Sequence, residues 1–194
     1  MSTNPFEHDT YELRRKILRI FGGAFYVYDP DGQLAFFSEQ KSFKLREDIR
    51  LYADLDQVIE LLTIQARSII DFSAAYDVVD TVDNERVGTL RRRGFKSMFR
   101  DEWEILDADE QPLGRIVEDS MAMALLRRAL TNLVPQKFRI ECHGRTVGTL
   151  RQNFNLFAPR IRIDFSMDPD HSLDRRLGLA AAILICAVEG RQAD

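Results

Sequence analysis

Apolar and polar residues alternate with a period of two along much of this chain. The alternation is clearest in three segments, Asp48–Asp54, Lys137–His143 and Arg160–Phe165. A strand that packs one face on a core and exposes the other face to water has this pattern. Antiparallel sheets contain such strands, whereas parallel sheets that are covered on both faces do not. About eleven or twelve such segments precede residue 172, so the pattern predicts a mainly antiparallel β protein.

A turn signal and a short repeat indicate how these strands follow one another. Asp29–Gly32 (DPDG) lies between two apolar segments, and its proline and glycine favour a tight turn. The sequence Val-Gly-Thr-Leu-Arg occurs at Val87–Arg91 and again at Val147–Arg151. Each copy leads to another alternating segment, Glu102–Leu106 or Arg160–Phe165. We therefore predict two related β-meanders.

The segment Leu177–Val188 near the end of the chain carries no charged side chain, and its most polar group is a thiol. A helix that is apolar on every side must be buried on every side. A helix of this length spans about 18 Å, which is shorter than the roughly 30 Å hydrocarbon layer of a bilayer. We expect a helix over about residues 172–189, with Ser172 as its N-cap, Asp174 in its first turn and Gly190 at its end.

Strands and helix together predict the fold. A barrel of about twelve strands has a lumen too wide for the side chains of its own wall to fill. The apolar C-terminal helix can fill this lumen, because small residues such as Ala181 keep it narrow on part of its girth. The predicted fold is a closed antiparallel barrel of about twelve strands around a buried apolar C-terminal helix. The predicted domain organisation is a disordered lead at residues 1–10 and a single barrel domain at residues 11–190.

Two further helices are suggested by local signals. Met121–Leu133 is rich in good helix formers, is preceded by Asp119 and Ser120 as candidate N-caps, and is followed by Pro135. We expect this helix to lie across the outside of the barrel or at one end. Leu55–Leu61 is a weaker helix candidate.

Composition and charge exclude several classes of protein. Of the 194 residues, 45% are hydrophobic and 30% are charged, as is usual for a globular domain. The formal net charge of −4 argues against a general nucleic-acid-binding protein. Cys142 and Cys186 are too few for a disulfide scaffold or a zinc site, and they suit a reducing compartment. The chain starts without the features of a secretion signal and offers no transmembrane segment, so the predicted location is the cytoplasm.

Five segments carry a pattern of turns and apolar positions that extends from about residue 11 to residue 189. They are Leu13–Gly32 (LRRKILRIFGGAFYVYDPDG), Phe36–Tyr52 (FFSEQKSFKLREDIRLY), Glu60–Gln65 (ELLTIQ), Arg86–Asp107 (RVGTLRRRGFKSMFRDEWEILD) and Leu113–Glu118 (LGRIVE). In this order they resemble the LURP-one-related proteins, which belong with the Tubby C-terminal domain and the phospholipid scramblases. The resemblance rests on the order of the segments, because no single motif is diagnostic.

The resemblance implies a twelve-stranded closed barrel around a C-terminal apolar helix, in agreement with the pattern of residues. It also implies membership of a group without established catalytic residues. Tubby domains bind phosphoinositides and scramblases associate with membranes. The basic residues that Tubby domains use form no motif that matches this chain, so none of them is transferred to it.

The densest cationic segment, Arg86–Arg100, contains six Lys or Arg residues and no acidic residue, and aromatic residues lie among them. Basic side chains near an anionic membrane surface gain about 1 kcal/mol each. The candidate patch for anionic headgroups consists of Arg91, Arg92, Arg93, Lys96 and Arg100. The same segment also suits a solvated hairpin that pairs with the acidic residues of Asp101–Glu104, and the sequence leaves this alternative open.

Other reactive residues favour structural roles. Asp168, Asp170 and Asp174 precede the C-terminal helix, but their spacing is incomplete for a calcium loop, so we expect turns and helix capping. Cys142 and His143 are neighbours on a predicted strand, where side chains point to opposite faces, so they cannot form a catalytic dyad. The sequence contains no phosphate-binding glycine loop, no metal-spaced His/Cys set and no hydrolase elbow. We expect no catalytic residue, no metal and no cofactor.

The sequence therefore favours a non-enzymatic binding module that docks at anionic phospholipid or membrane surfaces, with a peripheral location at the membrane. A protein-interaction or scaffold domain with an unknown protein partner is the alternative. Scramblase-like lipid transfer is a third hypothesis.

Overall fold

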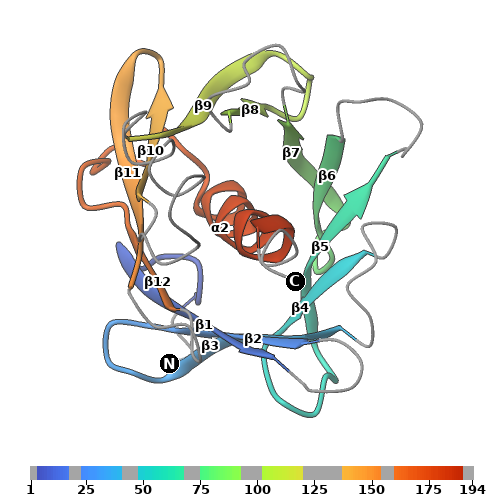
Figure 1. The fold of residues 1–194 in the computed structure, drawn as a ribbon. Coiled ribbons are helices and arrows are strands. Elements are labelled where there is room, and N and C mark those ends of the chain that lie inside the picture. The colour runs from blue at the N-terminus through green and yellow to red at the C-terminus, as the bar shows by residue number, and fades with distance from the viewer. Residues whose placement is uncertain are drawn as a thin grey trace.

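The computed structural model describes residues 4–17, 23–40, 48–67, 75–92, 102–119, 137–153 and 160–189, and within these ranges twelve β-strands close into an antiparallel barrel (Figure 1). The strands are β1 (Thr10–Ile17), β2 (Gly23–Tyr28), β3 (Leu34–Gln40), β4 (Ile49–Tyr52), β5 (Glu60–Ala66), β6 (Ala75–Asp80), β7 (Glu85–Arg92), β8 (Glu102–Leu106), β9 (Pro112–Glu118), β10 (Lys137–Cys142), β11 (Arg145–Gln152) and β12 (Arg160–Asp164). One helix, α2 (Arg175–Glu189), follows β12 within the described residues and lies in the middle of the ring of strands. The predicted barrel with a central C-terminal helix is confirmed.

Each strand pairs with the next strand along the chain, and the first strand pairs with the last. Leu13 of β1 lies opposite Val27 of β2 on one side and opposite Ile161 of β12 on the other, and this second pairing closes the barrel. β3 and β4 share a single pair, Phe37 with Tyr52. Full closure leaves no unpaired sheet edge, which removes the sites at which edge strands associate.

The predicted alternation of buried and exposed residues is present in the barrel wall. In β10, Phe138, Ile140 and Cys142 are buried, whereas Lys137 and Arg139 are exposed. Strands β6 and β12 show the same period of two. In β10 and β12 the apolar set therefore faces the interior of the barrel and the polar set faces solvent, whereas in β6 the buried set also includes Asp80.

The repeated Val-Gly-Thr-Leu-Arg sequence occupies equivalent places in two hairpins, β6–β7 and β10–β11. Gly88 of β7 lies opposite Val78, and Gly148 of β11 lies opposite Ile140. The register shifts directly after each of these pairs, so both hairpins carry an irregularity at the same step. Both copies then pair with the following strand, β8 or β12, as the predicted meanders require.

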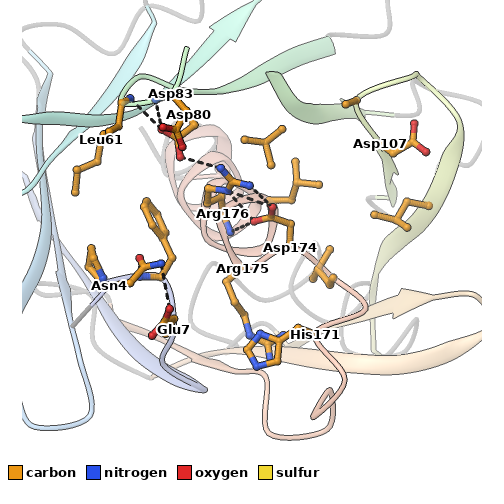
Figure 2. A pocket seen from close by; sticks show the side chains of 18 of the residues that line it. Asn4, Glu7, Leu61, Asp80, Asp83, Asp107, His171, Asp174, Arg175 and Arg176 are labelled. Carbon is orange, nitrogen blue, oxygen red and sulfur yellow. Dashed lines mark hydrogen bonds and ion pairs between the residues drawn. The ribbon is translucent and has the colours of Figure 1, made fainter. Parts of the chain in front are cut away.

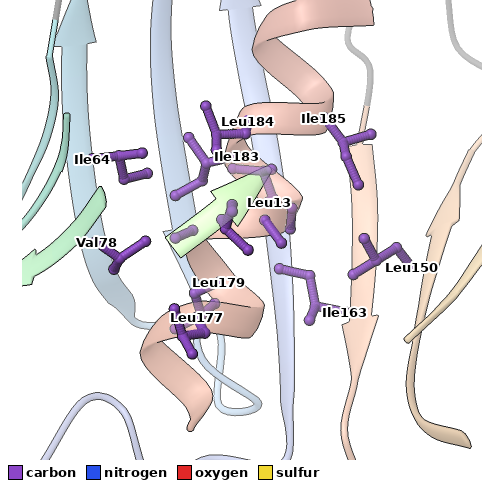
Figure 3. Packing of buried hydrophobic residues seen from close by; sticks show 14 of the residues in the cluster. Leu13, Ile64, Val78, Leu150, Ile163, Leu177, Leu179, Ile183, Leu184 and Ile185 are labelled. Atoms are coloured by element: carbon purple, nitrogen blue, oxygen red, sulfur yellow. The ribbon is translucent and has the colours of Figure 1, made fainter. Parts of the chain in front are cut away.

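α2 is buried around its whole circumference along most of its length. The described side chains from Leu177 to Ala187 are at most 8% exposed. Figure 3 shows residues of the wall that surround apolar residues of the helix, each at most 2% exposed: Leu13, Ile64, Val78, Leu150 and Ile163 around Leu177, Leu179, Ile183, Leu184 and Ile185. Full burial of such a side chain contributes about 1.5–3 kcal/mol as an upper estimate. The helix is therefore the centre of the hydrophobic core.

Glycines permit the helix and the wall to approach closely. The ring of Phe165 packs against Gly178 of α2 and Gly148 of β11. A Cβ atom added to Gly178 would lie 2.5 Å from this ring, and one added to Gly148 would lie 2.9 Å from it. A Cβ on Gly88 of β7 would lie 3.1 Å from the side chain of Leu177. These close contacts explain why glycine, which has no Cβ atom, occupies these three positions.

The start of the helix differs from the prediction in one detail. α2 begins at Arg175, and Asp174 is its N-cap, because its Oδ1 accepts a hydrogen bond of 2.9 Å from the backbone N–H of Arg176. The predicted N-cap Ser172 is wrong: its backbone N–H and its hydroxyl both donate to Asp168. Both residues have side chains suited to capping, and only the folded loop selects between them.

The weaker helix candidate Leu55–Leu61 is also wrong. Residues 53–59 form a loop, in which the backbone N–H of Ala53 donates to the carbonyl of Ile59 and Gln57 has a φ of 58°. The remaining residues of the candidate belong to β5. The predicted helix Met121–Leu133 lies outside the described residues.

The segment predicted as a disordered lead contains residues 4–9, which contact the barrel. The ring of Phe6 packs 4.7 Å from that of Phe36, between centroids. The hydroxyl of Tyr11 donates to the carbonyl of Pro5 and accepts from the backbone N–H of His8. The division between a lead and a domain at residue 11 stays a prediction.

The direction of the strands divides the connections between two ends of the barrel. Neighbouring strands run in opposite directions, so successive connections alternate between the ends. We define the turn end as residues 4–9, 29–33, 53–59, 81–84, 107–111, 143–144 and 165–174, where β1 and α2 both begin. The predicted turn Asp29–Gly32 is among them, with Gly32 at a φ of 78°. The other connections follow β1, β3, β5, β7, β9 and β11, and most of their residues lie outside the described part of the chain.

Candidate functional site

A pocket of about 830 Å³ opens at the turn end, beside the first turn of α2 (Figure 2). The residues that line it come from the lead, from the loops of the turn end, from strand residues next to these loops and from α2. Its apolar wall includes Pro5, Phe6, Leu61, Val87 and Leu113. Its polar lining includes Glu7, Asp80, Asp83, Asp107, Asp174, Arg175 and Arg176. No pattern in the sequence predicts this pocket, because its walls come from segments that are far apart along the chain.

A buried ion pair supports the floor of this pocket. Nη1 of Arg175 donates to Oδ2 of Asp168 at 2.8 Å, and both side chains are 3% exposed. Asp168 also accepts from the backbone N–H groups of Ser172 and Leu173. Burial alone would raise the pKa of Asp168, but the hydrogen bonds from Ser172, Leu173 and Arg175 outweigh burial and lower this pKa. Asp168 is therefore a charged, fully engaged structural group.

A second ion pair network fixes Arg176 at the pocket. Its guanidinium contacts Asp80 of β6 at 2.8 Å and Asp174 at 2.6 Å, as Figure 2 shows. These hydrogen bonds raise the pKa of Arg176. Burial opposes ionisation of Asp80, but the bond from Arg176 and two backbone N–H groups lower its pKa overall. The positive charge of Arg176 is therefore already neutralised within the protein.

Exposed apolar side chains gather at the same end. The large apolar residues that are at least half exposed in the described part of the chain are Leu55, Val58, Ile59, Val82 and Met167. All five belong to the turn end, and Val82 also lines the pocket. The loop 53–59 and the turn 81–84 are adjacent, because Thr81 donates to the carbonyls of Leu61 and Glu60 next to that loop.

The candidate headgroup patch is described only in part. Arg91 and Arg92 end β7, near the opposite end of the barrel from the pocket, whereas Arg93, Lys96 and Arg100 lie outside the described residues. Arg91 is 3.5 Å from Glu104 of β8, its partner in the strand register, and is half-buried. Arg92 is partly buried and also has an interaction partner.

Arg86, at the start of the predicted basic segment, is separated from the rest of it. About six residues of extended strand, roughly 20 Å, lie between Arg86 and Arg92. Arg86 contacts Asp77 at 3.2 Å and Glu110 at 3.1 Å, and Arg67 contacts the same two carboxylates at 2.7 Å and 2.8 Å. Hydrogen bonds from both arginines lower the pKa of Glu110. Arg86 thus belongs to a network on the outer face of the wall.

The reactive residues outside the pocket occupy structural positions. Cys142, the last residue of β10, is 1% exposed, and burial raises the pKa of its thiol to about 11. The sequence predicts His143 on the same strand, but it is exposed in the turn that follows β10, with a φ of 49°. Cys186 is buried in α2. In the described ranges, no three His, Cys, Asp or Glu residues are grouped as metal ligands.

Among the helical residues that the structure describes, no helix has both the length and the apolar character to span a bilayer.

These observations define a class of protein: a closed twelve-stranded barrel whose core is its own C-terminal helix. A profile of the LURP-one-related family matches residues 9–186, and this chain belongs to that family. An X-ray structure of a protein from Arabidopsis thaliana is similar in fold, with a TM-score of 0.51 and 12% sequence identity over 98% of both chains. At this identity the likeness shows the fold alone. Among curated proteins, none matches the chain.

Proposed function

We propose that this LURP-one-related protein is a non-enzymatic module that docks at the cytoplasmic face of anionic membranes. The proposed docking surface is the candidate headgroup patch, Arg91, Arg92, Arg93, Lys96 and Arg100. The structure describes two of these residues, Arg91 and Arg92, which end β7 at the end of the barrel opposite the pocket. The observation that carries the proposal is the separation of charge between the two ends of the barrel.

The turn end is strongly acidic. Within its residues as defined above thirteen are Asp or Glu and none is Lys or Arg. The two arginines that adjoin it, Arg175 and Arg176 of α2, are held in ion pairs with carboxylates of the protein. The acidic residues are Glu7, Asp9, Asp29, Asp31, Asp54, Asp56, Asp83, Asp107, Asp109, Glu110, Asp168, Asp170 and Asp174. An anionic surface repels this end.

The sequences that follow β1, β3, β5, β7, β9 and β11 have the reverse balance. These connections, residues 18–22, 41–48, 67–74, 93–101, 119–136 and 153–159, contain ten Lys or Arg and five acidic residues. They also contain seven of the thirteen phenylalanines of the chain. Basic and aromatic residues together suit the headgroup region of an anionic membrane, where each basic side chain gains about 1 kcal/mol.

Vesicle flotation of the full chain tests this proposal. The protein is expected to float with vesicles that contain phosphatidylserine, not with phosphatidylcholine alone, and added salt should weaken binding. The triple variant R93A/K96A/R100A should lower the partition coefficient by about tenfold to a hundredfold, because it removes three attractive charges. It spares Arg91 and Arg92, whose contacts within the barrel would complicate the result.

A matched variant, R115A/R145A/R162A, removes the same charge from exposed positions on β9, β11 and β12. It should retain most of the binding, because these residues lie away from the proposed surface. Equal loss in both triple variants would mean that net charge alone governs binding, and would contradict the proposal. Absence of any dependence on anionic lipid would also contradict it.

The proposal does not extend to scramblase-like lipid transfer. That activity would require α2 to leave the barrel, and its apolar side chains are buried against the wall. Removal of the helix would expose the whole core to water.

A further inference from the structure

We propose that the turn-end pocket binds a basic amphipathic segment of a partner protein. An apolar side chain of that segment would enter the pocket, and its Lys or Arg side chains would lie on the acidic rim. This inference goes beyond membrane docking, because it concerns the other end of the barrel and a different class of ligand.

The pocket has the size and the lining of a site for an apolar side chain. Its volume of about 830 Å³ lies within the roughly 300–1,000 Å³ of ligand sites in proteins. Phe6, Leu61, Val87 and Leu113 form apolar wall on several sides, and α2 forms the floor with Leu177. A leucine or phenylalanine side chain fits this chemistry.

The charges of the rim favour a cationic occupant. Arg175 and Arg176 line the pocket, but each is held in ion pairs with carboxylates of the protein. Glu7, Asp83 and Asp107 also line it, come from three separate segments, and form no ion pair among the described residues. Because the two arginines are already paired and these three carboxylates pair with no cation among the described residues, the opening repels anions, headgroups included, and attracts Lys or Arg side chains.

Apolar side chains extend the surface beyond the pocket. Val82 lies at its edge and is 66% exposed, and Leu55, Val58 and Ile59 are more than half exposed on the adjacent loop. A cluster of exposed apolar residues with a charged rim is typical of a protein-binding surface, and a small-molecule cation would leave it uncovered. The occupant is therefore a segment of a protein, with apolar and basic residues.

Fluorescence anisotropy with two labelled peptides, in the absence of lipid, tests this inference on the full chain. Both peptides have the same length and the same lysines, but the remaining positions are leucine in one and serine in the other. The leucine peptide should bind at least about tenfold more tightly, because one buried leucine contributes about 1.5–3 kcal/mol. Equal affinity of the two peptides would mean that only charge attracts them, and would overturn the proposal.

Two pairs of variants locate the binding site. Ala108→Trp places an indole at the lining of the pocket and should weaken the leucine peptide about tenfold, whereas Gln111→Trp on the same loop should not. The double variant D83N/D107N should lower the affinity for both peptides about fivefold. The control D31N/D109N removes two acidic residues that do not line the pocket, and it should have less than half that effect on the affinity. If control and pocket variants behave alike, the pocket is not the site.

Sedimentation velocity separates a partner protein from a second copy of this chain. Because the two ends carry opposite charge, copies could associate end to end, and the peptide would then compete with self-association. If the protein forms oligomers and the leucine peptide dissociates them, the occupant of the pocket is a second copy of the chain, and the proposal is overturned. The variant R93A/K96A/R100A should bind the peptide normally, so failure of membrane docking and failure of this inference are distinguishable.

Discussion

Asp168 shows at the scale of one residue how this fold uses a buried charge. Its carboxylate meets the guanidinium of Arg175 and two backbone N–H groups in a place that is almost closed to water. Arg175 also contacts Asp9, which precedes it by 166 residues, at 3.3 Å, and stacks 4.8 Å from the ring of Phe165. The pair thus joins the lead, the loop and the helix.

We expect Asp168→Asn to lower the free energy of unfolding by about 3–5 kcal/mol, because it leaves the buried charge of Arg175 without its main partner. Urea denaturation at pH 7 measures this change. Asp170→Asn, on an exposed residue of the same loop, should change stability by less than about 0.5 kcal/mol. A similar change in the free energy of unfolding for both variants would show that the buried ion pair of Asp168 and Arg175 does not stabilise the fold as expected.

The same residue predicts a dependence of stability on pH. The pKa of Asp168 is lower in the folded protein than in the unfolded chain, so its contribution is fully present above the unfolded value of about 3.9. The contribution is lost as the pH falls through the folded pKa. Thermal unfolding of the wild type should therefore show a steeper loss of stability below about pH 4 than unfolding of Asp168→Asn. Parallel curves would show that Asp168 does not titrate as expected.

At the scale of the element, one position of α2, Gly178, is determined by the space inside the barrel and not by helix propensity. Gly178 lies inside the helix, where alanine would normally stabilise by about 1 kcal/mol. Here a Cβ would lie 2.5 Å from the ring of Phe165, closer than side-chain atoms can approach. Gly178 is therefore required by the packing of Phe165.

We expect Gly178→Ala to destabilise the protein by about 1–3 kcal/mol, against the sign of its propensity. A double-mutant cycle with Phe165→Leu, measured by urea denaturation, provides the control. The smaller side chain should make room for the methyl group, so the double variant should be more stable than the sum of the single changes predicts. Additive effects would mean that the cost of Gly178→Ala has another origin.

At the scale of the whole molecule, the wall and the helix depend on one another. A twelve-stranded barrel cannot fill its lumen with wall side chains, and α2 cannot expose its apolar surface to water. The wall is therefore expected to have no stable folded state without the helix.

A chain that ends at Asp174 tests this dependence. We expect it to lack a cooperative thermal transition and to show solvent-exposed tryptophan emission from Trp103, the single tryptophan of the chain, which is 3% exposed in the barrel wall. A chain shortened only by residues 190–194 serves as the control and should unfold cooperatively. Blue-shifted emission and cooperative unfolding of the shorter chain would show that the wall folds alone.

The sequence by itself determined the architecture of this protein, because the patterns that define it are local. Alternation as in Lys137–Cys142 marks a wall with one wet face, and the apolar run from Leu177 marks a helix that must be enclosed. A closed barrel around that helix satisfies both patterns. The repeat at Val87 and Val147 also predicted two related β-meanders from sequence alone.

Only the tertiary structure decided which residues meet. Ser172 and Asp174 carry equivalent capping signals, and the packed loop assigned the cap to Asp174. The contact of Asp9 with Arg175, the walls of the pocket and the acidic character of one end all combine segments that are distant along the chain. Such groupings depend on strand direction and on closure between β1 and β12, which no local pattern of residues encodes.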